Sequence, residues 1–250
     1  MSVSVSKKTG NTELKLTAYH NCDDVQLFWR TMVDGQADGM IPGCLGFKIE
    51  RKRKDRDGKW GRVEVLRNRV GFSDDSGFED NAAAAYTTKP SSTWPFQRYD
   101  WTDHGANNGQ TVQYNIKAMI LPEGKCVGID ELSEIAESGW TEPIEINAYC
   151  DNGFSTFFNR GIVMSQYVAR ILRKNEWEPK DILENIEKIE DPLRIFLSGE
   201  LRIEMLNMIN EVSKNTDLEL YAALYELYDR ELIDGLKSLN PSGKLYGFLG

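Results

Sequence analysis

The chain has 250 residues, of which 40% are hydrophobic and 28% charged, and its formal net charge is −9. This composition is that of a globular protein and excludes an intrinsically disordered chain, which would have too few hydrophobic residues to form a core. Residues 1–150 hold 18 Lys and Arg against 22 Asp and Glu, and residues 151–250 hold 12 against 17. Both parts are acidic, so neither has the basic balance of a surface that holds nucleic acid through its phosphates.

The N-terminus and the cysteines favour a cytoplasmic protein. Met1–Gly10 lacks the apolar core of a signal peptide, and no apolar run reaches the about 18 residues that a membrane span needs. None of the cysteines has CxxC spacing; they are Cys22, Cys44, Cys126 and Cys150. We therefore predict reduced thiols and no metal or other cofactor. The alternative is a metal site on His20, Cys22 and one further cysteine.

Predicted strands fill the first 150 residues. Apolar or alternating runs of strand length occur at 14–18, 25–29, 45–50, 63–66, 99–101, 112–118 and 143–146. Asp55–Gly58 reads as a turn between two of these runs, and residues 68–94 read as a long polar loop. These strands, with no helix of note among them, predict an all-β immunoglobulin-like sandwich over residues 1–150.

One stretch of this region resembles a fibronectin type III domain. Asp103–Ala118 is similar to the E–F corner and F strand of such domains, and Gly46–Arg51 is similar to their C strand. The resemblance implies that Tyr114 is a buried corner tyrosine whose hydroxyl bonds to the preceding backbone, with Ile116 facing the core. An ordinary tyrosine at a sheet edge is the alternative.

The basic residues concentrate in one place, on the predicted hairpin. They are Arg51, Lys52, Arg53 and Lys54. A charge run of this kind is usually the solvated rim of a hairpin. The alternative is a contact with a polyanion, either nucleic acid or an anionic lipid headgroup.

After residue 150 the apolar residues change to helical spacing. Val163, Tyr167 and Ile171 predict a helix over 161–174. A second helical face is formed by Leu201, Met205, Met208, Ile209 and Val212.

A strand–helix–strand pattern ends the chain. Residues 218–227 predict a buried strand, Asp229 predicts the cap of a helix that ends at Leu239, and residues 244–250 predict a second strand. Two strands joined by a crossover helix form a βαβ unit with a parallel sheet. Because a parallel sheet is covered by several crossovers, we expect the α/β domain at 151–250 to be incomplete and the chain to be truncated.

The order of three segments in this second part resembles that of bacterial phospholipase D-like proteins. The segments are Phe157–Gln166, Phe196–Leu201 and Ala222–Leu227. In that family such segments precede the catalytic core, and a fibronectin-like sandwich can stand in front of them. The resemblance implies an α+β chain of more than one domain: the sandwich, then the start of a phospholipase D-like α/β domain.

The family resemblance also implies site residues and a reaction. Arg160, Ser165 and Gln166 would line a phosphate pocket; structural roles near a helix start are the alternative. In the family a histidine attacks phosphorus to form a phosphohistidine, and a second histidine protonates the leaving oxygen, without a metal. Each histidine begins a His-x-Lys-(x)4-Asp motif.

This chain has two histidines, His20 and His104, and neither is followed by a lysine two positions later. We therefore expect the N-terminal portion of a phosphodiesterase that acts on lipid or nucleic acid, catalytically incomplete by itself. The alternative is a non-enzymatic binding protein that uses the sandwich as its recognition module. Two copies could also form a homodimer, but without the motif a dimer would not create a catalytic centre.

Overall fold

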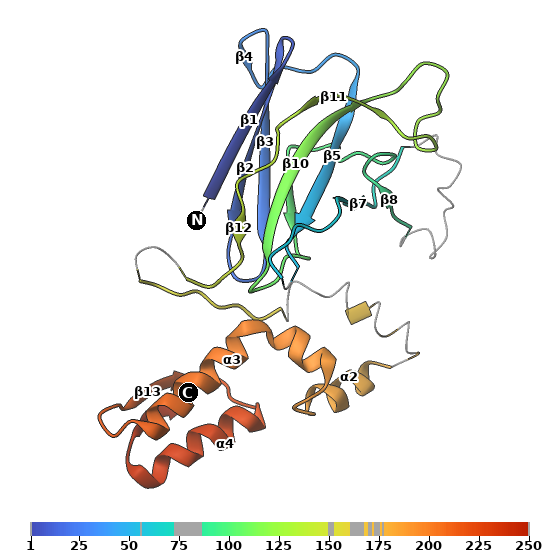
Figure 1. Cartoon of the computed structure of the whole chain (residues 1–250). Coiled ribbons are helices and arrows are strands. Elements are labelled where there is room, and N and C mark those ends of the chain that lie inside the picture. The colour runs from blue at the N-terminus through green and yellow to red at the C-terminus, as the bar shows by residue number, and fades with distance from the viewer. Residues whose placement is uncertain are drawn as a thin grey trace. The chain divides into compact units, whose positions relative to one another are not determined.

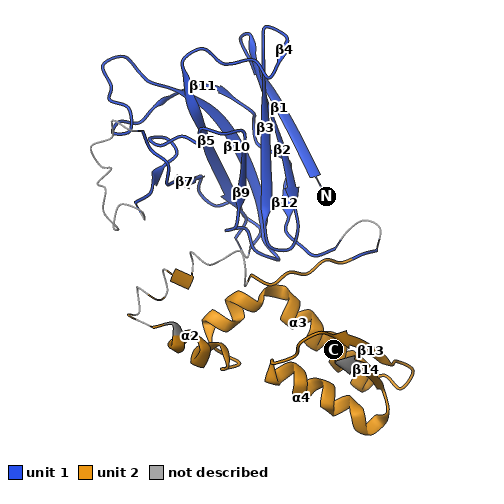
Figure 2. Ribbon diagram, turned by 180° about the vertical axis from the view of Figure 1, so that it is seen from behind, with its two compact units in different colours: residues 1–154 blue, residues 155–250 orange. Residues whose placement is uncertain are grey.

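The computed structural model describes residues 2–55, 57–72, 87–149, 153–160, 168, 169, 172, 176 and 178–249. The chain divides into two compact units, residues 1–154 and residues 155–250 (Figure 2). Within the described residues no helix has the length and apolar character needed to cross a membrane.

Two antiparallel sheets make up most of the first unit (Figure 1). One sheet has the order β1 (Ser2–Thr9), β2 (Thr12–His20), β3 (Val25–Val33) and β4 (Gln36–Ala37), with β9 (Asp100–Asp103) also paired to β3. The other has the order β11 (Ser133–Glu137), β10 (Thr111–Ile120), β5 (Cys44–Arg53) and β6 (Glu64–Val65), with β12 (Ile144–Glu145) also paired to β10.

The alternation of apolar residues places one core between these two sheets. Leu16 of β2 and Leu27 of β3 are fully buried, and so are Ile49 of β5 and Ile116 of β10. All four belong to a single cluster of buried side chains, so the inner faces of the two sheets pack against each other. The predicted strands of this unit are confirmed.

The strands β1, β4 and β11 of the first unit were not predicted, and neither was a strand pair that overlaps the predicted loop at 68–94. β1 is rich in Ser and Lys and contributes only Val3 and Val5 to the core, and β11 contributes Ala136. The predicted loop at 68–94 is described only at its two ends, where β7 (Arg67–Asn68) pairs with β8 (Lys89–Pro90). Trp94 is buried there and donates to the carbonyl of Gly128 at 3.1 Å.

The second unit consists of helices and a parallel strand pair. Its elements are α2 (Pro179–Ile186), α3 (Pro192–Lys214), β13 (Leu220–Leu224), α4 (Arg230–Leu239), the 3-10 helix η2 (Asn240–Ser242) and β14 (Leu245–Leu249). β13 and β14 pair in parallel, so the predicted βαβ unit is confirmed. Asp229 caps α4 as predicted, because its Oδ1 accepts a hydrogen bond from the amide of Leu232 at 3.1 Å.

Two predictions for this unit are corrected. β13 is shorter than predicted and only one of its faces packs on helices: Leu220 packs against the buried cluster of Ile209, Val212 and Leu239, whereas Tyr221 is exposed. On the second helix, Ile209 and Val212 are buried but Met208 is half exposed. The predicted helix at 161–174 lies mostly outside the described residues.

Candidate functional site

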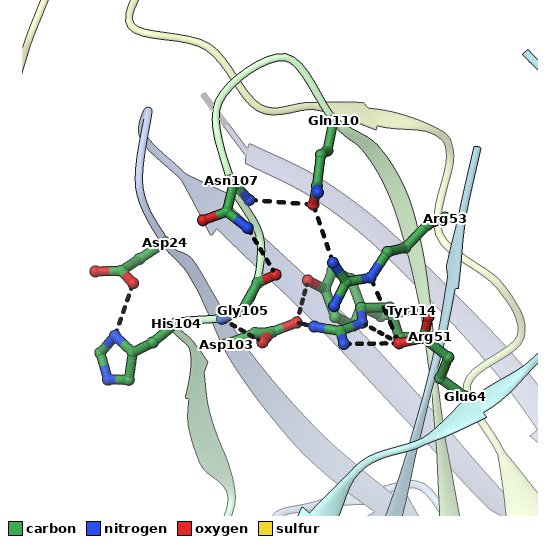
Figure 3. Close-up of polar contacts among 10 residues, drawn as sticks. All are labelled: Asp24, Arg51, Arg53, Glu64, Asp103, His104, Gly105, Asn107, Gln110 and Tyr114. Carbon is green, nitrogen blue, oxygen red and sulfur yellow. Dashed lines mark hydrogen bonds and ion pairs between the residues drawn. The ribbon is translucent and has the colours of Figure 1, made fainter. Parts of the chain in front are cut away.

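The basic run at the end of β5 begins with a buried arginine. Arg51 lies on the core face, where its guanidinium bonds to Asp103 and donates to Glu64 Oε2 at 2.7 Å and 3.1 Å (Figure 3). The hydroxyl of Tyr114 donates to the same Asp103 carboxylate at 2.8 Å. The prediction of a solvated rim, and of a polyanion contact, is therefore wrong for Arg51.

The Arg51–Asp103–Tyr114 cluster joins the two sheets. Asp103 comes from β9 of the first sheet, and Arg51 and Tyr114 come from β5 and β10 of the second. Tyr114 is buried as predicted, but its hydroxyl bonds to a carboxylate and not to the preceding backbone. A carboxylate between a guanidinium and a phenol satisfies all three buried polar groups at once.

The environment of the cluster fixes its charge state. Burial raises the pKa of Tyr114 well above its ordinary value, and the nearby Asp103 carboxylate raises it further. Burial would lower the pKa of Arg51, but Asp103 and the hydrogen bond to Glu64 outweigh it and raise the pKa. At neutral pH the phenol is therefore neutral and the guanidinium charged, which suits a structural cross-link between the sheets.

The other basic residues of the run also contact groups of the sandwich. The Lys52 ammonium lies 4.1 Å from the ring centroid of Trp140, and the Lys54 ammonium lies 5.3 Å from that of Trp60. Arg53 donates to Gln110 Oε1 at 3.2 Å and lies 3.4 Å from Glu64. Each of these three residues thus has a partner within the sandwich, and Arg53 shares Glu64 with Arg51. The polyanion contact of Lys52, Arg53 and Lys54 stays a prediction.

His104 and Asp24 form a half-exposed pair beside this cluster. His104 Nδ1 lies 2.7 Å from Asp24 Oδ1 (Figure 3). A carboxylate that holds one ring nitrogen is the usual way to orient a histidine for proton transfer. No nucleophilic side chain contacts His104 in the described part of the chain, so this pair alone does not define an active site.

In the second unit, the first two family-like segments contact each other. The backbone amide of Arg160 donates to the carbonyl of Leu197 at 2.7 Å, and the amide of Leu201 donates to Phe158 at 3.4 Å. The Arg160 guanidinium lies 4.8 Å from the ring centroid of Phe196. The predicted partners Ser165 and Gln166 lie outside the described residues.

This contact depends on a glycine. Gly199 interrupts α3 with φ 54° and ψ −155°, a conformation that only glycine adopts at low cost. A Cβ atom at this position would lie 2.6 Å from the carbonyl oxygen of Phe158. Gly199 therefore both kinks the helix and lets the extended segment around Phe158 approach it.

Gly199→Ala is expected to destabilise the second unit by about 2–3 kcal/mol, because the side chain adds both backbone strain and a clash. Hydrogen exchange of the amides of α3 would measure the loss of protection. Gly235→Ala is the matched control: its Cβ would meet Ile209 at an ordinary 3.4 Å, and alanine is the better helix former. Equal effects of the two substitutions would contradict the role assigned to Gly199.

A groove of about 610 Å³ lies on the outer face of the first sheet, away from the core. Tyr19 and Phe28 line one part of it, and Lys15, Arg30 and Asp38 line another. Sequence reasoning missed this site, although a signal exists: the outward positions of two predicted neighbouring strands carry aromatic and charged residues instead of small polar ones. The volume is within the usual range of small-ligand sites, about 300–1,000 Å³.

The described residues form no metal-binding cluster. No three His, Cys, Asp or Glu side chains gather to hold a metal ion anywhere in the described ranges, so the alternative metal site on His20 and Cys22 has no support there. Cys22, Cys44 and Cys126 are thiols, as predicted, and Cys150 lies outside the described residues.

The chain was compared with families, curated proteins and solved structures. No family model, no curated protein and no solved structure matches it.

Proposed function

We propose that this chain is the N-terminal portion of a phospholipase D-like phosphodiesterase. The contact between the segments around Arg160 and Gly199 is the observation that carries the proposal. These two segments, which carry the family resemblance, lie about 40 residues apart in the sequence, and their backbones bond to each other through Arg160, Leu197, Phe158 and Leu201. Two motifs that form one local structure are expected of a family core and not of chance matches.

The remaining features are consistent with the same proposal. The third family-like segment, Ala222–Leu227, begins within β13 of the parallel βαβ unit. The strand orders β2-β3-β9 and β11-β10-β5-β6, with a buried Tyr114 on β10, support a fibronectin type III-like sandwich as the preceding domain.

In the proposed enzyme, residues 1–250 supply the scaffold and part of a phosphate pocket. A guanidinium stacked on an aromatic ring is held in a fixed orientation, which suits bidentate contact with phosphate oxygens. We retain Arg160 for this role, together with Ser165 and Gln166 from the sequence resemblance. The nucleophilic histidine and the proton-donating histidine would lie outside residues 1–250, because neither His20 nor His104 begins the required motif.

Hydrolysis of bis(p-nitrophenyl) phosphate tests this proposal. We expect the intact protein to be active in EDTA and residues 1–250 alone to be inactive. Replacing either motif histidine by alanine should lower the rate by about 10³-fold or more, whereas His20→Ala and His104→Ala should leave it unchanged. The proposal would be overturned if the protein made in the cell has no His-x-Lys-(x)4-Asp motif, or if the 250-residue chain is active by itself.

One observation favours the alternative function, a non-enzymatic binding protein with the sandwich as its recognition module. That observation is the groove on the outer face of the first sheet, which lies in the unit that has no family-like phosphodiesterase segment. A binding role of the sandwich is compatible with either function.

A further inference from the structure

We propose that the groove on the outer face of the first sheet binds a neutral oligosaccharide. This inference does not rest on the proposed phosphodiesterase activity, because the groove belongs entirely to the sandwich. It rests on three features of the groove: an exposed aromatic pair, a set of charged side chains without excess of either sign, and a fixed wall.

The aromatic pair consists of Tyr19 on β2 and Phe28 on β3. Both point outward, 50% and 45% exposed, and their rings meet edge to face with centroids 5.8 Å apart at an interplanar angle of 82°. Such large exposed rings on a sheet face add nothing to the core. Outside the core, an aromatic ring beside polar groups is suited to pack against the apolar C–H face of a sugar ring.

The charged residues of the groove are balanced. Lys15 lies directly opposite Arg30 across the β2–β3 pair, an arrangement of like charges that costs stability in a sheet. Arg30 is held by Asp38 through two hydrogen bonds of 3.0 Å and 2.7 Å. Lys15 and the neighbouring Glu13 form no ion pair with any described residue. The groove thus holds cationic donors and anionic acceptors in equal number.

This charge balance decides between ligand classes. A polyanion such as single-stranded nucleic acid would be attracted by Lys15 and Arg30 but repelled by Glu13, Asp38 and the net charge of −9. The hydroxyl groups of a sugar both donate and accept, so they can hydrogen-bond to both kinds of charged side chain without repulsion from either. A neutral oligosaccharide is therefore the class that fits.

The β3–β4 hairpin forms one side of the groove, and hydrogen bonds within the hairpin hold it in place. Asp38 has a φ of 57°, which is uncommon for a residue other than glycine, and its amide donates to the carbonyl of Thr31 at 2.7 Å. The Thr31 hydroxyl in turn donates to the carbonyl of Gly39 at 2.6 Å. Strained backbone that is held by neighbouring bonds often marks a ligand site.

Titration calorimetry of the 250-residue chain with neutral hexasaccharides tests the inference. The probes are the β-1,4-linked hexamers of glucose, mannose, xylose and N-acetylglucosamine and the α-1,4-linked hexamer of glucose. We expect at least one to bind, and Tyr19→Ala and Phe28→Ala each to weaken binding about tenfold, at the lower end of the effect of removing one ring that stacks on a nucleobase. Tyr149→Ala is the matched control, an exposed tyrosine of the same unit outside the groove.

Three results would overturn the inference: no hexamer binds, the groove variants bind as well as the parent chain, or a thymidine oligonucleotide binds more tightly than every hexamer and loses affinity in Lys15→Ala. Thermal melting of each variant distinguishes loss of binding from loss of fold. Because both rings face away from the core, we expect the variants to have the melting temperature of the parent chain. The binding results are compared between variants that meet this expectation.

Discussion

Replacing Arg51 with methionine should lower the free energy of unfolding of the first unit by about 3–5 kcal/mol, the usual cost of breaking a buried ion pair. The side chains of Arg51 and Asp103 are only 8% and 3% exposed. Removing the guanidinium leaves the Asp103 carboxylate buried with only the Tyr114 hydroxyl and the amide of Gly105 to bond it. Urea unfolding followed by tryptophan fluorescence measures the loss.

The exposed pair of Arg30 and Asp38 provides the control for this substitution. It also joins an arginine to an aspartate by two hydrogen bonds, but its side chains are 70% and 60% exposed. Arg30→Met should therefore have little effect, since solvent screens exposed pairs. The double variant Arg51→Met, Asp103→Leu should recover much of the lost stability. Equal losses for Arg51→Met and Arg30→Met would show that the buried cluster does not join the sheets.

In the second unit the largest effect is expected from Arg194→Met. The Arg194 guanidinium is buried and donates to the carbonyl of Ile186 at 2.7 Å, to Asp229 at 2.8 Å and to Glu231 at 3.0 Å. It therefore connects the end of α2 and the first turn of α4 to α3. Without it Asp229 loses its guanidinium partner and Glu231 keeps only Arg202, and we expect the opening of α4 to become about 3 kcal/mol easier.

Hydrogen exchange of the α4 amides measures this change, with rates expected to rise about 100-fold in Arg194→Met. A hydrogen bond from Arg202 is the main cause that holds the pKa of Glu231 below its usual value, and Arg194 adds to it. Lys180→Met is the control, because its partner Glu178 and Lys180 itself are both exposed. Exchange rates that change equally in the two variants would contradict the role of Arg194.

The parts of the fold that follow from local pattern were predictable. Leu14, Leu16 and Ala18 alternate cleanly, and Asp229 has both the type and the position of a helix cap, so β2 and the start of α4 could be read from the sequence. β1 could not, because its Ser and Lys residues carry little hydrophobic signal and it is a strand only through its pairing with β2. β1 and β2 are joined by a turn of only two residues, and it is this pairing, not the intrinsic propensity of the β1 residues, that makes β1 a strand.

The candidate sites were also only partly predictable, because they depend on contacts between different strands. The burial of Tyr114 was expected from the resemblance to fibronectin type III domains, but its partner was not, since Asp103 comes from the opposite sheet. Arg51 belongs to a basic run that looks solvated, and only the register of β5 shows that it faces the core. The groove around Tyr19 and Phe28 likewise depends on which strands lie side by side.

The central claim is that the intact protein cleaves a phosphodiester through a phosphohistidine. The most direct test is mass spectrometry of the intact protein after turnover has been stopped with a denaturant that contains no acid. The account predicts a phosphoryl adduct on a histidine followed two positions later by lysine, outside residues 1–250. An adduct on His20 or His104 would contradict the account. So would steady turnover that leaves every histidine unmodified and continues after all histidines of His-x-Lys-(x)4-Asp motifs have been replaced.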